Sequence, residues 1–273
     1  STFGVQDALP ISLTYGILRL ANFAHGDFMT LGAYMTLMLN LAGANIWVSV
    51  ILGAGLTIAV ALLTEKLLWR RMRDRRATST TLIIMSLGLA LFMRNGIILI
   101  WGAANQSYDL PVATALEIGE IRIAYYRVIV MGLAVVAIAT LHLLLQYTKM
   151  GKAMRAVADN IDLARVSGIN VERVVIWTWV LAAGLTALGG SMYGLITAVR
   201  PNMGWFLILP MFASVILGGI GNVYGAIAGA FVIGITQEVS TYWIPSEYKI
   251  AVSLLLMMAV LLLRPQGIFR GTL

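Results

Sequence analysis

The chain has 273 residues, of which 60% are hydrophobic and only 11% are charged, and its formal net charge is +7. Soluble domains carry roughly 25% charged residues, so this composition excludes an ordinary water-soluble enzyme or binding domain. The mean hydropathy of +0.88 agrees. The absence of cysteine excludes a disulfide framework and a thiolate metal site.

Nine apolar stretches follow one another along the chain. A helix needs about 20 apolar residues to cross a hydrocarbon layer of ~30 Å. Such helices are predicted at 8–21, 27–44, 47–69, 79–101, 122–147, 174–199, 205–217, 222–239 and 249–263. The first and seventh are short, which is typical of partial or re-entrant helices. The predicted fold is therefore all-α: one polytopic membrane domain, 1–273, with about eight to nine transmembrane or re-entrant helices.

The basic residues gather beside the apolar stretches. Segment 69–76 holds five arginines, segment 148–173 holds five lysines and arginines, and the tail holds Arg264 and Arg270, whereas segment 102–121 has only acids. Because short loops rich in Lys and Arg stay in the cytoplasm, we expect the N-terminus outside and the C-terminus inside. The same distribution argues against a nucleic-acid partner. The first ten residues lack the basic region of a cleavable signal.

Two breaks between apolar stretches combine glycine with asparagine: "NFAHG" at 22–26 and "GGIGN" at 218–222. Non-helical backbone inside a membrane needs partners from protein or from a water-filled cavity, so both breaks are candidates for lining a polar pathway. The alternative is a tight turn in which Asn22 or Asp27 caps the next helix, and Asp27 fits the N-cap best. His25 is a pathway candidate or a hydrogen-bonded packing residue.

Arg94 lies inside the apolar stretch "LALFMRNGIILIWG". A charge at a helix centre costs roughly 2.5–3.5 kcal/mol on insertion scales. We therefore expect Arg94 to line the pathway, to lock two helices by pairing with a carboxylate, or to reach the membrane interface. The nucleotide-binding motif G-x-x-x-x-G-K-[ST], H-E-x-x-H and G-x-S-x-G are all absent. No catalytic residue, cofactor or metal is expected.

Residues 147–175, "YTKMGKAMRAVADNIDLARVSGINVERVV", form the longest hydrophilic segment. Its pattern predicts a short amphipathic helix, with Asp159, Asn160 and Asp162 as caps or first-turn charges and a glycine as C-cap. Met154, Val157, Leu163 and Val166 are expected to form one apolar face. Such a helix would dock on a cytoplasmic partner or, alternatively, on the membrane surface.

"DLARVSG" at 162–168 resembles the E-A-A-x-x-x-G signature of ABC importer permeases, with Leu163 in place of the first alanine. Four longer blocks resemble the LivH-like branched-chain amino acid permeases: "LTYGILRLANFAHGDFMTLGAY", "GKAMRAVADNIDLARVSGIN", "PMFASVILGGIGNVYGAIAGA" and "LLLRPQGIFRG". The family has a longer glycine-bearing apolar helix where "STFGVQDALP" stands here. The first span is therefore expected to be shortened, re-entrant or altered.

The resemblance implies a type II importer of branched-chain or neutral amino acids in a prokaryotic inner membrane. Its implied partners are a second related permease in a heterodimer, two cytoplasmic ATPase subunits and an extracytoplasmic substrate-binding protein. The residues implied to couple to the ATPases are Arg155, Asp159, Asp162, Ala164, Arg165 and Gly168. The pathway residues expected from the breaks and the buried charge are Asn22, His25, Gly26, Arg94, Gly218, Gly219, Gly221 and Asn222.

Two rival functions stay open at this point. A urea or short-chain amide importer would share the architecture. An ion-coupled carrier or channel that works alone would need carboxylates within its spans, and the apolar stretches contain almost none.

Overall fold

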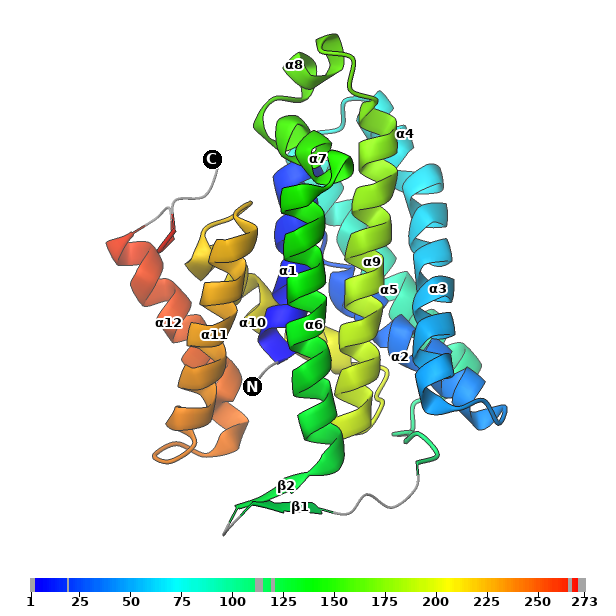
Figure 1. The fold of residues 1–273 in the computed structure, drawn as a ribbon, viewed down its shortest axis with the longest axis vertical. Helices are drawn as coiled ribbons and strands as arrows, with labels where there is room; N and C mark the ends of the chain where they lie inside the picture. Colours follow the sequence, from blue (N-terminus) through cyan, green and yellow to red (C-terminus); the bar gives the residue numbers. More distant parts are fainter. Residues whose placement is uncertain (1–2, 19, 111–114, 119–120, 265–266, 270–273) are drawn as a thin grey trace.

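The computed structural model describes residues 3–18, 20–110, 115–118, 121–264 and 267–269 (Figure 1). Each predicted apolar stretch contains a helix. These helices are α1 (Phe3–Leu18), α2 (His25–Leu41), α3 (Ile46–Thr64), α5 (Ser79–Trp101), α6 (Tyr125–Tyr147), α9 (Val171–Ile196), α10 (Met203–Gly218), α11 (Val223–Ser240) and α12 (Lys249–Leu263). The predicted ranges of the fourth and ninth stretches coincide with α5 and α12.

Six helical stretches in the described residues are long and apolar enough to cross a membrane: Ile46–Asp74, Ser79–Trp101, Tyr125–Tyr147, Val171–Ile196, Val223–Ser240 and Ser246–Leu263. Two shorter apolar helices, Ala8–Leu18 and Met203–Gly218, lie in the first and seventh predicted stretches. The prediction that these two are short is confirmed. The helix α2 has only 17 residues, and 13 of them are buried, so it lies inside the bundle rather than at its surface.

The third helix continues further than its apolar pattern. A wide π-helical turn, η1 (Glu65–Trp69), follows α3 up to the predicted end at residue 69, and a short helix, α4 (Arg70–Asp74), continues beyond that end. The first three arginines of the basic segment therefore lie on a helix. The next helix, α5, begins where the Thr78 hydroxyl accepts a hydrogen bond from the backbone N–H of Thr81 at 3.3 Å, as N-cap threonines do.

A β-hairpin interrupts the helical pattern between α5 and α6. Strand β1 (Ala115–Ile118) pairs antiparallel with β2 (Ile121–Ala124), and Ala115 stands opposite Ala124. The helix α6 accordingly begins three residues later than predicted. Isoleucine recurs at every second position of β2, the period of a strand rather than of a helix.

Small residues bring the central helices together. A Cβ atom added to Gly32 of α2 would lie 2.5 Å from the Cα of Ala187 on α9, and one added to Gly190 would lie 2.0 Å from the Met29 carbonyl oxygen. In lipid, where neighbouring helices gain little from the hydrophobic effect, such close backbone approach supplies the packing energy. Two buried indoles, Trp69 of η1 and Trp179 of α9, stack with ring centroids 6.2 Å apart.

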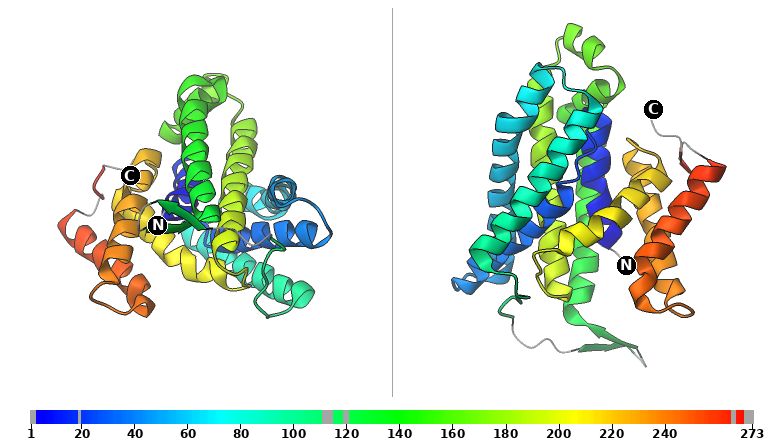
Figure 2. Two further views of the ribbon diagram at one scale, coloured as in Figure 1. Left: turned by 60° about the horizontal axis from the view of Figure 1, so that its bottom comes forward. Right: turned by 180° about the vertical axis from the view of Figure 1, so that it is seen from behind.

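The helices α10, α11 and α12 stand to one side of the bundle, and α10 crosses obliquely toward the larger group (Figure 2). Met29, Ile208, Ala226 and other buried residues of α1, α2, α10 and α11 form the cluster that joins the two groups. Helices α7 (Lys149–Asp159) and α8 (Ile161–Val166) lie with α4 at one end of the bundle, which we call the basic end. The hairpin and the turn between α11 and α12 lie at the opposite end (Figure 1).

Candidate functional site

The first break lies between α1 and α2, and side chains satisfy its backbone. Asn22 is fully buried, and its Oδ1 accepts from the backbone N–H of Ala24 at 3.0 Å. The N–H of Phe23 donates to the Ser86 hydroxyl on α5 at 3.2 Å. The Asn22 side-chain nitrogen is buried without a partner among the described residues. The break is therefore a polar point inside the bundle, and its role in lining a pathway stays a prediction.

His25 is the first residue of α2 and is 3% exposed. Its Nε2 lies 3.0 Å from the Thr14 hydroxyl, and its ring meets Trp179 edge-on. These contacts are those of the packing histidine that the sequence left as an alternative. A pathway role for His25 stays a prediction.

Asp27 does not cap α2, so the prediction of an N-cap was wrong. The helix begins at His25, the capping position falls on Ala24, and Asp27 lies in the first turn. Both of its carboxylate oxygens accept from Arg94 of α5, each at 3.2 Å. A charge buried in a membrane span is stabilised by an opposite charge. Here the charge of Arg94 is paired with the carboxylate of Asp27, which lies at the positive, N-terminal end of α2.

Arg94 is therefore an inter-helix lock, one of the three roles that the sequence allowed. Its side chain is 12% exposed and that of Asp27 is 1% exposed. The guanidinium also lies over the ring of Trp205, 4.5 Å from its centroid, which adds a cation–π contact. The pair joins α2, α5 and α10.

Gly26 lets α10 approach the start of α2. A Cβ on Gly26 would lie 2.3 Å from the Gly204 carbonyl oxygen, and one on Gly204 would lie 1.7 Å from that of Gly26. The Gly204 N–H donates to the Thr30 hydroxyl at 3.1 Å. The first turns of α2 and α10 thus meet backbone to backbone inside the protein.

The second break, between α10 and α11, depends on glycine and asparagine. Gly219 and Gly221 have φ angles of +107° and +84°, in the left-handed region that favours glycine. The Asn222 Oδ1 accepts from the N–H groups of Tyr224 and Gly225, both at 3.0 Å. It therefore caps α11, a role that the sequence prediction did not give it.

The C-terminal segment completes this break, which the sequence reading did not foresee. The N–H of Ile268 donates to the Leu217 carbonyl at 2.8 Å, and that of Phe269 donates to the Gly218 carbonyl at 3.2 Å. These bonds satisfy carbonyls that a helix end leaves without partners. Arg270 of the basic tail and Glu120, an acid of segment 102–121, lie outside the described residues.

The hydrophilic loop holds two short helices rather than one. Thr148 caps α7, and the Asn160 Oδ1 caps α8 by accepting from the N–H groups of Asp162 and Leu163 at 3.1 and 2.9 Å. Asp162 is the first-turn acid of α8. Gly168 follows α8 with φ +84°, as the predicted glycine C-cap requires.

The prediction of one apolar face was wrong. Met154 and Val157 of α7 are 1% and 2% exposed, whereas Leu163 and Val166 of α8 are 62% and 80% exposed. The extended backbone at Asn160 separates the two helices, so α7 packs into the bundle while the apolar side chains of α8 are exposed.

Most of the predicted coupling residues are at the surface, but one is not. Arg155, Asp159, Asp162, Arg165 and Gly168 are exposed. Ala164 is only 3% exposed, so it positions α8 and offers little surface to a partner.

A chain of polar contacts joins α7 to the second break. An Arg155 nitrogen donates to the Gln146 oxygen at 3.0 Å, and the Gln146 nitrogen donates to the Tyr224 hydroxyl at 2.9 Å. The same hydroxyl lies 2.9 Å from the His142 Nδ1. Tyr224 is two residues beyond the Asn222 cap, so the chain of contacts links the basic loop to α11.

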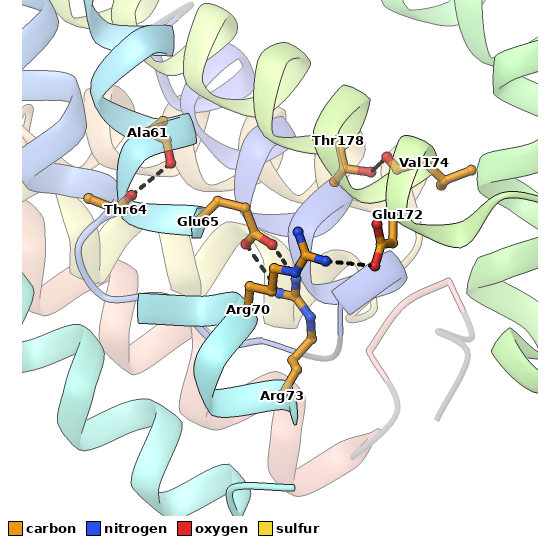
Figure 3. A network of polar contacts seen from close by, with 8 residues as sticks. All are labelled: Ala61, Thr64, Glu65, Arg70, Arg73, Glu172, Val174 and Thr178. Carbon is orange, nitrogen blue, oxygen red and sulfur yellow. Dashed lines mark hydrogen bonds and ion pairs between the residues drawn. The ribbon is translucent and has the colours of Figure 1, made fainter. Parts of the chain in front are cut away.

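Ion pairs fix the extension of α3 at the basic end (Figure 3). Arg73 pairs with the buried carboxylate of Glu65, and Arg70 pairs with Glu172 of α9 at 3.1 Å. These four residues line a cavity of about 840 Å³. Asp159 and Arg165 of the loop line the same cavity, so the structure brings two predicted coupling residues beside this ion-pair cluster.

The predicted pathway residues are not gathered in one cavity. Gly221 and Asn222 line a cavity of about 210 Å³ at the basic end, together with Arg155. The other six (Asn22, His25, Gly26, Arg94, Gly218 and Gly219) line neither this cavity nor the two larger ones. They are buried contacts of the helices around the breaks.

A cavity of about 550 Å³ lies at the opposite end, between α10 and the facing ends of α9, α11 and α12. Its polar wall includes Arg200, Asn202, Gln237, Glu238 and Lys249. The sequence assigned no role to these residues, because they come from three separate segments. No group of three or more potential metal-ligating side chains gathers within the described part of the chain.

Apolar helices long enough to cross a membrane, broken at two polar points, define a polytopic membrane protein. The family model described as branched-chain amino acid transport system / permease component matches residues 7–261. The chain belongs to this family.

Curated relatives cover almost the whole chain. The high-affinity branched-chain amino acid permease protein LivH of Escherichia coli K12 is 28% identical over 96% of this chain and 89% of its own length. A probable LivH of Methanocaldococcus jannaschii is 30% identical over 96% of this chain and 86% of its own length. The fructose import permease FrcC of Rhizobium meliloti is 32% identical over only 40% of this chain and 32% of its own length. No solved structure matches.

Proposed function

We propose that this chain is the transmembrane subunit of an ATP-driven importer for branched-chain or neutral amino acids. The single observation that carries the proposal is the family match across residues 7–261. Relatives named for branched-chain amino acid transport cover 96% of the chain, which favours amino acids over urea as the cargo.

The basic end faces the cytoplasm in this proposal. Residues 70–78 and the α7–α8 loop carry clustered Lys and Arg, and short basic loops stay inside. The cavity lined by Arg200 then opens toward the extracytoplasmic side, where a substrate-binding protein docks. Since the C-terminal end of α12 lies at the basic end (Figure 1), the same orientation gives a cytoplasmic C-terminus.

The ATPase subunits dock on α8. Ile161, Leu163 and Val166 are 41%, 62% and 80% exposed at the far tip of the basic end, and exposed apolar side chains rimmed by charges are typical of protein interfaces. Arg155, Asp159, Asp162 and Arg165 supply charges around this surface. Ala164 and Gly168 keep α8 in shape, because one is buried and the other has a positive φ.

Closure of the ATPases moves α8, and the movement reaches the pathway through α7. The buried side chains of Met154 and Val157 hold α7 to the bundle, and the Arg155–Gln146–Tyr224 contacts lead to the second break. The residues around Gly221 and Asn222 then change position, and the pathway switches from outward-facing to inward-facing access. This is a rigid-body transmission of a two-state change, and it requires no chemistry in this chain.

The assembly is a type II importer with a second, related permease. The helices α5, α6 and α12 are poorly buried within this chain. Of the most apolar 18 residues of each span, 28%, 22% and 6%, respectively, are buried. Such faces suit lipid or the partner permease. The pathway residues Asn22, His25, Gly26, Arg94, Gly218 and Gly219 support the moving helices from inside.

The decisive experiment is affinity purification of the chain with its partners, followed by solute-dependent ATPase assays in lipid. We expect two ATPase subunits to copurify and leucine with its binding protein to stimulate hydrolysis. Stimulation of hydrolysis by urea instead of leucine would identify urea as the transported solute. Full solute transport by the purified chain alone would refute the proposal.

A variant pair tests the docking surface. Val166→Glu places a charge on the exposed apolar side of α8, and Lys152→Glu places one at an exposed position of α7. We expect Val166→Glu to reduce ATPase copurification about tenfold, as loss of a central interface residue does, and Lys152→Glu to preserve it. Equal copurification of both variants would contradict docking on α8.

A further inference from the structure

The cavity at the opposite end has the size and position of a ligand site. Its volume of about 550 Å³ falls within the roughly 300–1,000 Å³ of small-molecule pockets. It runs along one face of α10, from Met203 past Pro210 to Ser214, so it reaches from the mouth of the bundle toward its interior.

One charge at this mouth is not neutralised. Arg200 lines the cavity and is exposed, and its side chain has no hydrogen-bond or ion-pair partner among the described residues. Lys249 and Glu238 also line it, but they pair with each other, at 3.2 and 3.1 Å to the two carboxylate oxygens. The mouth therefore carries a net positive charge, which attracts a carboxylate.

Acceptors for an ammonium group lie around the same mouth. The Glu238 side chain is 53% exposed, so its oxygens remain reachable beside Lys249. Pro210 lacks the N–H that would bond the Phe206 carbonyl within α10, and both residues line the cavity. Carboxylate and carbonyl oxygens are the acceptors that an ammonium requires.

The inner wall is apolar. Met203 and Met211 of α10 are 4% exposed and Ile233 of α11 is 2% exposed, and all three line the cavity. Methionine fills irregular space and adapts to ligands of different shape. These three side chains suit a branched aliphatic side chain.

We propose that this cavity is the first binding site of the amino acid on the permease, with Arg200 holding the α-carboxylate, Glu238 the ammonium and α10 the side chain. The inference rests on the proposed function and deepens it. It places substrate recognition on α10, away from the breaks that the sequence singled out. A paired guanidinium–carboxylate contact is charge-assisted and geometrically specific, so Arg200 selects for an intact α-carboxylate.

Cysteine labelling tests occupancy directly, because the chain has no cysteine of its own. The full complex in liposomes carries Met211→Cys, at a position that lines the cavity, or Tyr242→Cys, which lies in the turn after α11 at the same end, is 84% exposed and does not line the cavity. A charged methanethiosulfonate reagent is added from outside. We expect leucine to slow the labelling of Met211→Cys about tenfold and to leave the labelling of Tyr242→Cys unchanged.

The carboxylate requirement gives a sharper contrast. Isoamylamine has the amine and side chain of leucine without the carboxylate, and we expect it to give no protection. Arg200→Gln, added to Met211→Cys, should abolish the protection by leucine. Protection by both compounds, or protection that survives Arg200→Gln, would overturn the inference.

Transport separates this inference from the proposed function. In the complete complex, Arg200→Gln should lower the initial rate of leucine uptake about tenfold, the scale of a lost charge-assisted hydrogen bond. The matched control Arg127→Gln removes an exposed arginine at the same end that does not line the cavity, and it should transport normally.

If the complex with the unaltered chain fails to import leucine, the proposed function is wrong. If it imports leucine and Arg200→Gln matches Arg127→Gln, only the binding site is wrong. Should Arg200→Gln not accumulate in the membrane, the difference between leucine and isoamylamine in Met211→Cys alone decides the matter.

Discussion

The interior around α2 and the tip of the basic loop differ in which side chains they bury and which they expose. In α2, polar and charged side chains are buried, and Asp27 finds its partner in Arg94 within the same chain. In α8, apolar side chains such as Val166 are exposed, and nothing in the described residues covers them. The buried charges of the interior are paired within the chain, whereas the exposed apolar side chains of α8 need a second surface to cover them.

This difference separates stability from coupling. A substitution in the interior should change how tightly the bundle holds together, because its contacts join three or four helices. A substitution on α8 should change the affinity for a partner and leave the bundle intact. Four pairs of variants test this separation, in order of decreasing effect.

Asp27→Ala should have the largest effect. It leaves Arg94 buried without a carboxylate, and removal of one partner of a buried pair typically costs about 3–5 kcal/mol. Denaturant unfolding in mixed micelles measures the loss. The control Glu172→Ala breaks an exposed ion pair, in which the side chain of Arg70 is 54% exposed and that of Glu172 is 75% exposed. This loss should cost at most about 1 kcal/mol. Equal losses would show that the Asp27 pair is not desolvated.

Gly204→Ala should come next. The new Cβ would lie 1.7 Å from the Gly26 carbonyl oxygen, so α2 and α10 must move apart, and overpacking of this kind costs about 1–3 kcal/mol. The same unfolding assay applies.

Gly96→Ala is the matched control for Gly204→Ala. It adds a Cβ on α5 with nothing within 4 Å, and alanine is favoured over glycine in a helix by roughly 0.5–1 kcal/mol. A small gain in stability is therefore expected. A destabilisation as large as that of Gly204→Ala would mean that the α2–α10 contact is not the cause.

Gly168→Ala should act only on the loop. Its φ of +84° costs an L-residue roughly 1–2 kcal/mol, although open space surrounds the position. We expect weaker ATPase copurification with an unchanged unfolding midpoint. The larger Gly168→Trp should weaken docking further, and unchanged docking in both variants would refute the coupling role of this turn.

The smallest effect compares two asparagine caps. Asn222→Ala and Asn160→Ala each remove a side chain that accepts two backbone N–H groups, a loss of about 1 kcal/mol. The first should lower the stability of the bundle. The second should slow ATPase-coupled transport while the bundle keeps its unfolding midpoint. A shift of the midpoint by Asn160→Ala would mean that α8 is part of the cooperative core.

Hydropathy predicted the helices well because lipid imposes one requirement on every span, namely enough apolar residues in helical form. It could not show that α2 is buried on nearly all sides, since a helix facing protein and one facing lipid are both apolar. It also missed α4, because polar residues beyond a span continue a helix as readily as they end it.

The site was harder to predict. Asn160 was identified as a cap because capping depends on the next few residues of the same segment. The cap at Asn222 was not predicted, although the same short-range signal is present there. The partner of Asp27 lies 67 positions away along the chain, and the cavity beside Arg200 is built from four segments. No local pattern carries such information.

By itself, the sequence determined the solvent of this protein, the number and limits of its apolar helices, the basic end and the positions of the two breaks, because each follows from composition or short-range spacing. Only the tertiary structure decided which charges meet, which face of the loop is exposed and where a cavity opens along α10. These depend on backbones brought close by small residues such as Gly26 and Gly204, and that proximity arises only when distant helices pack together.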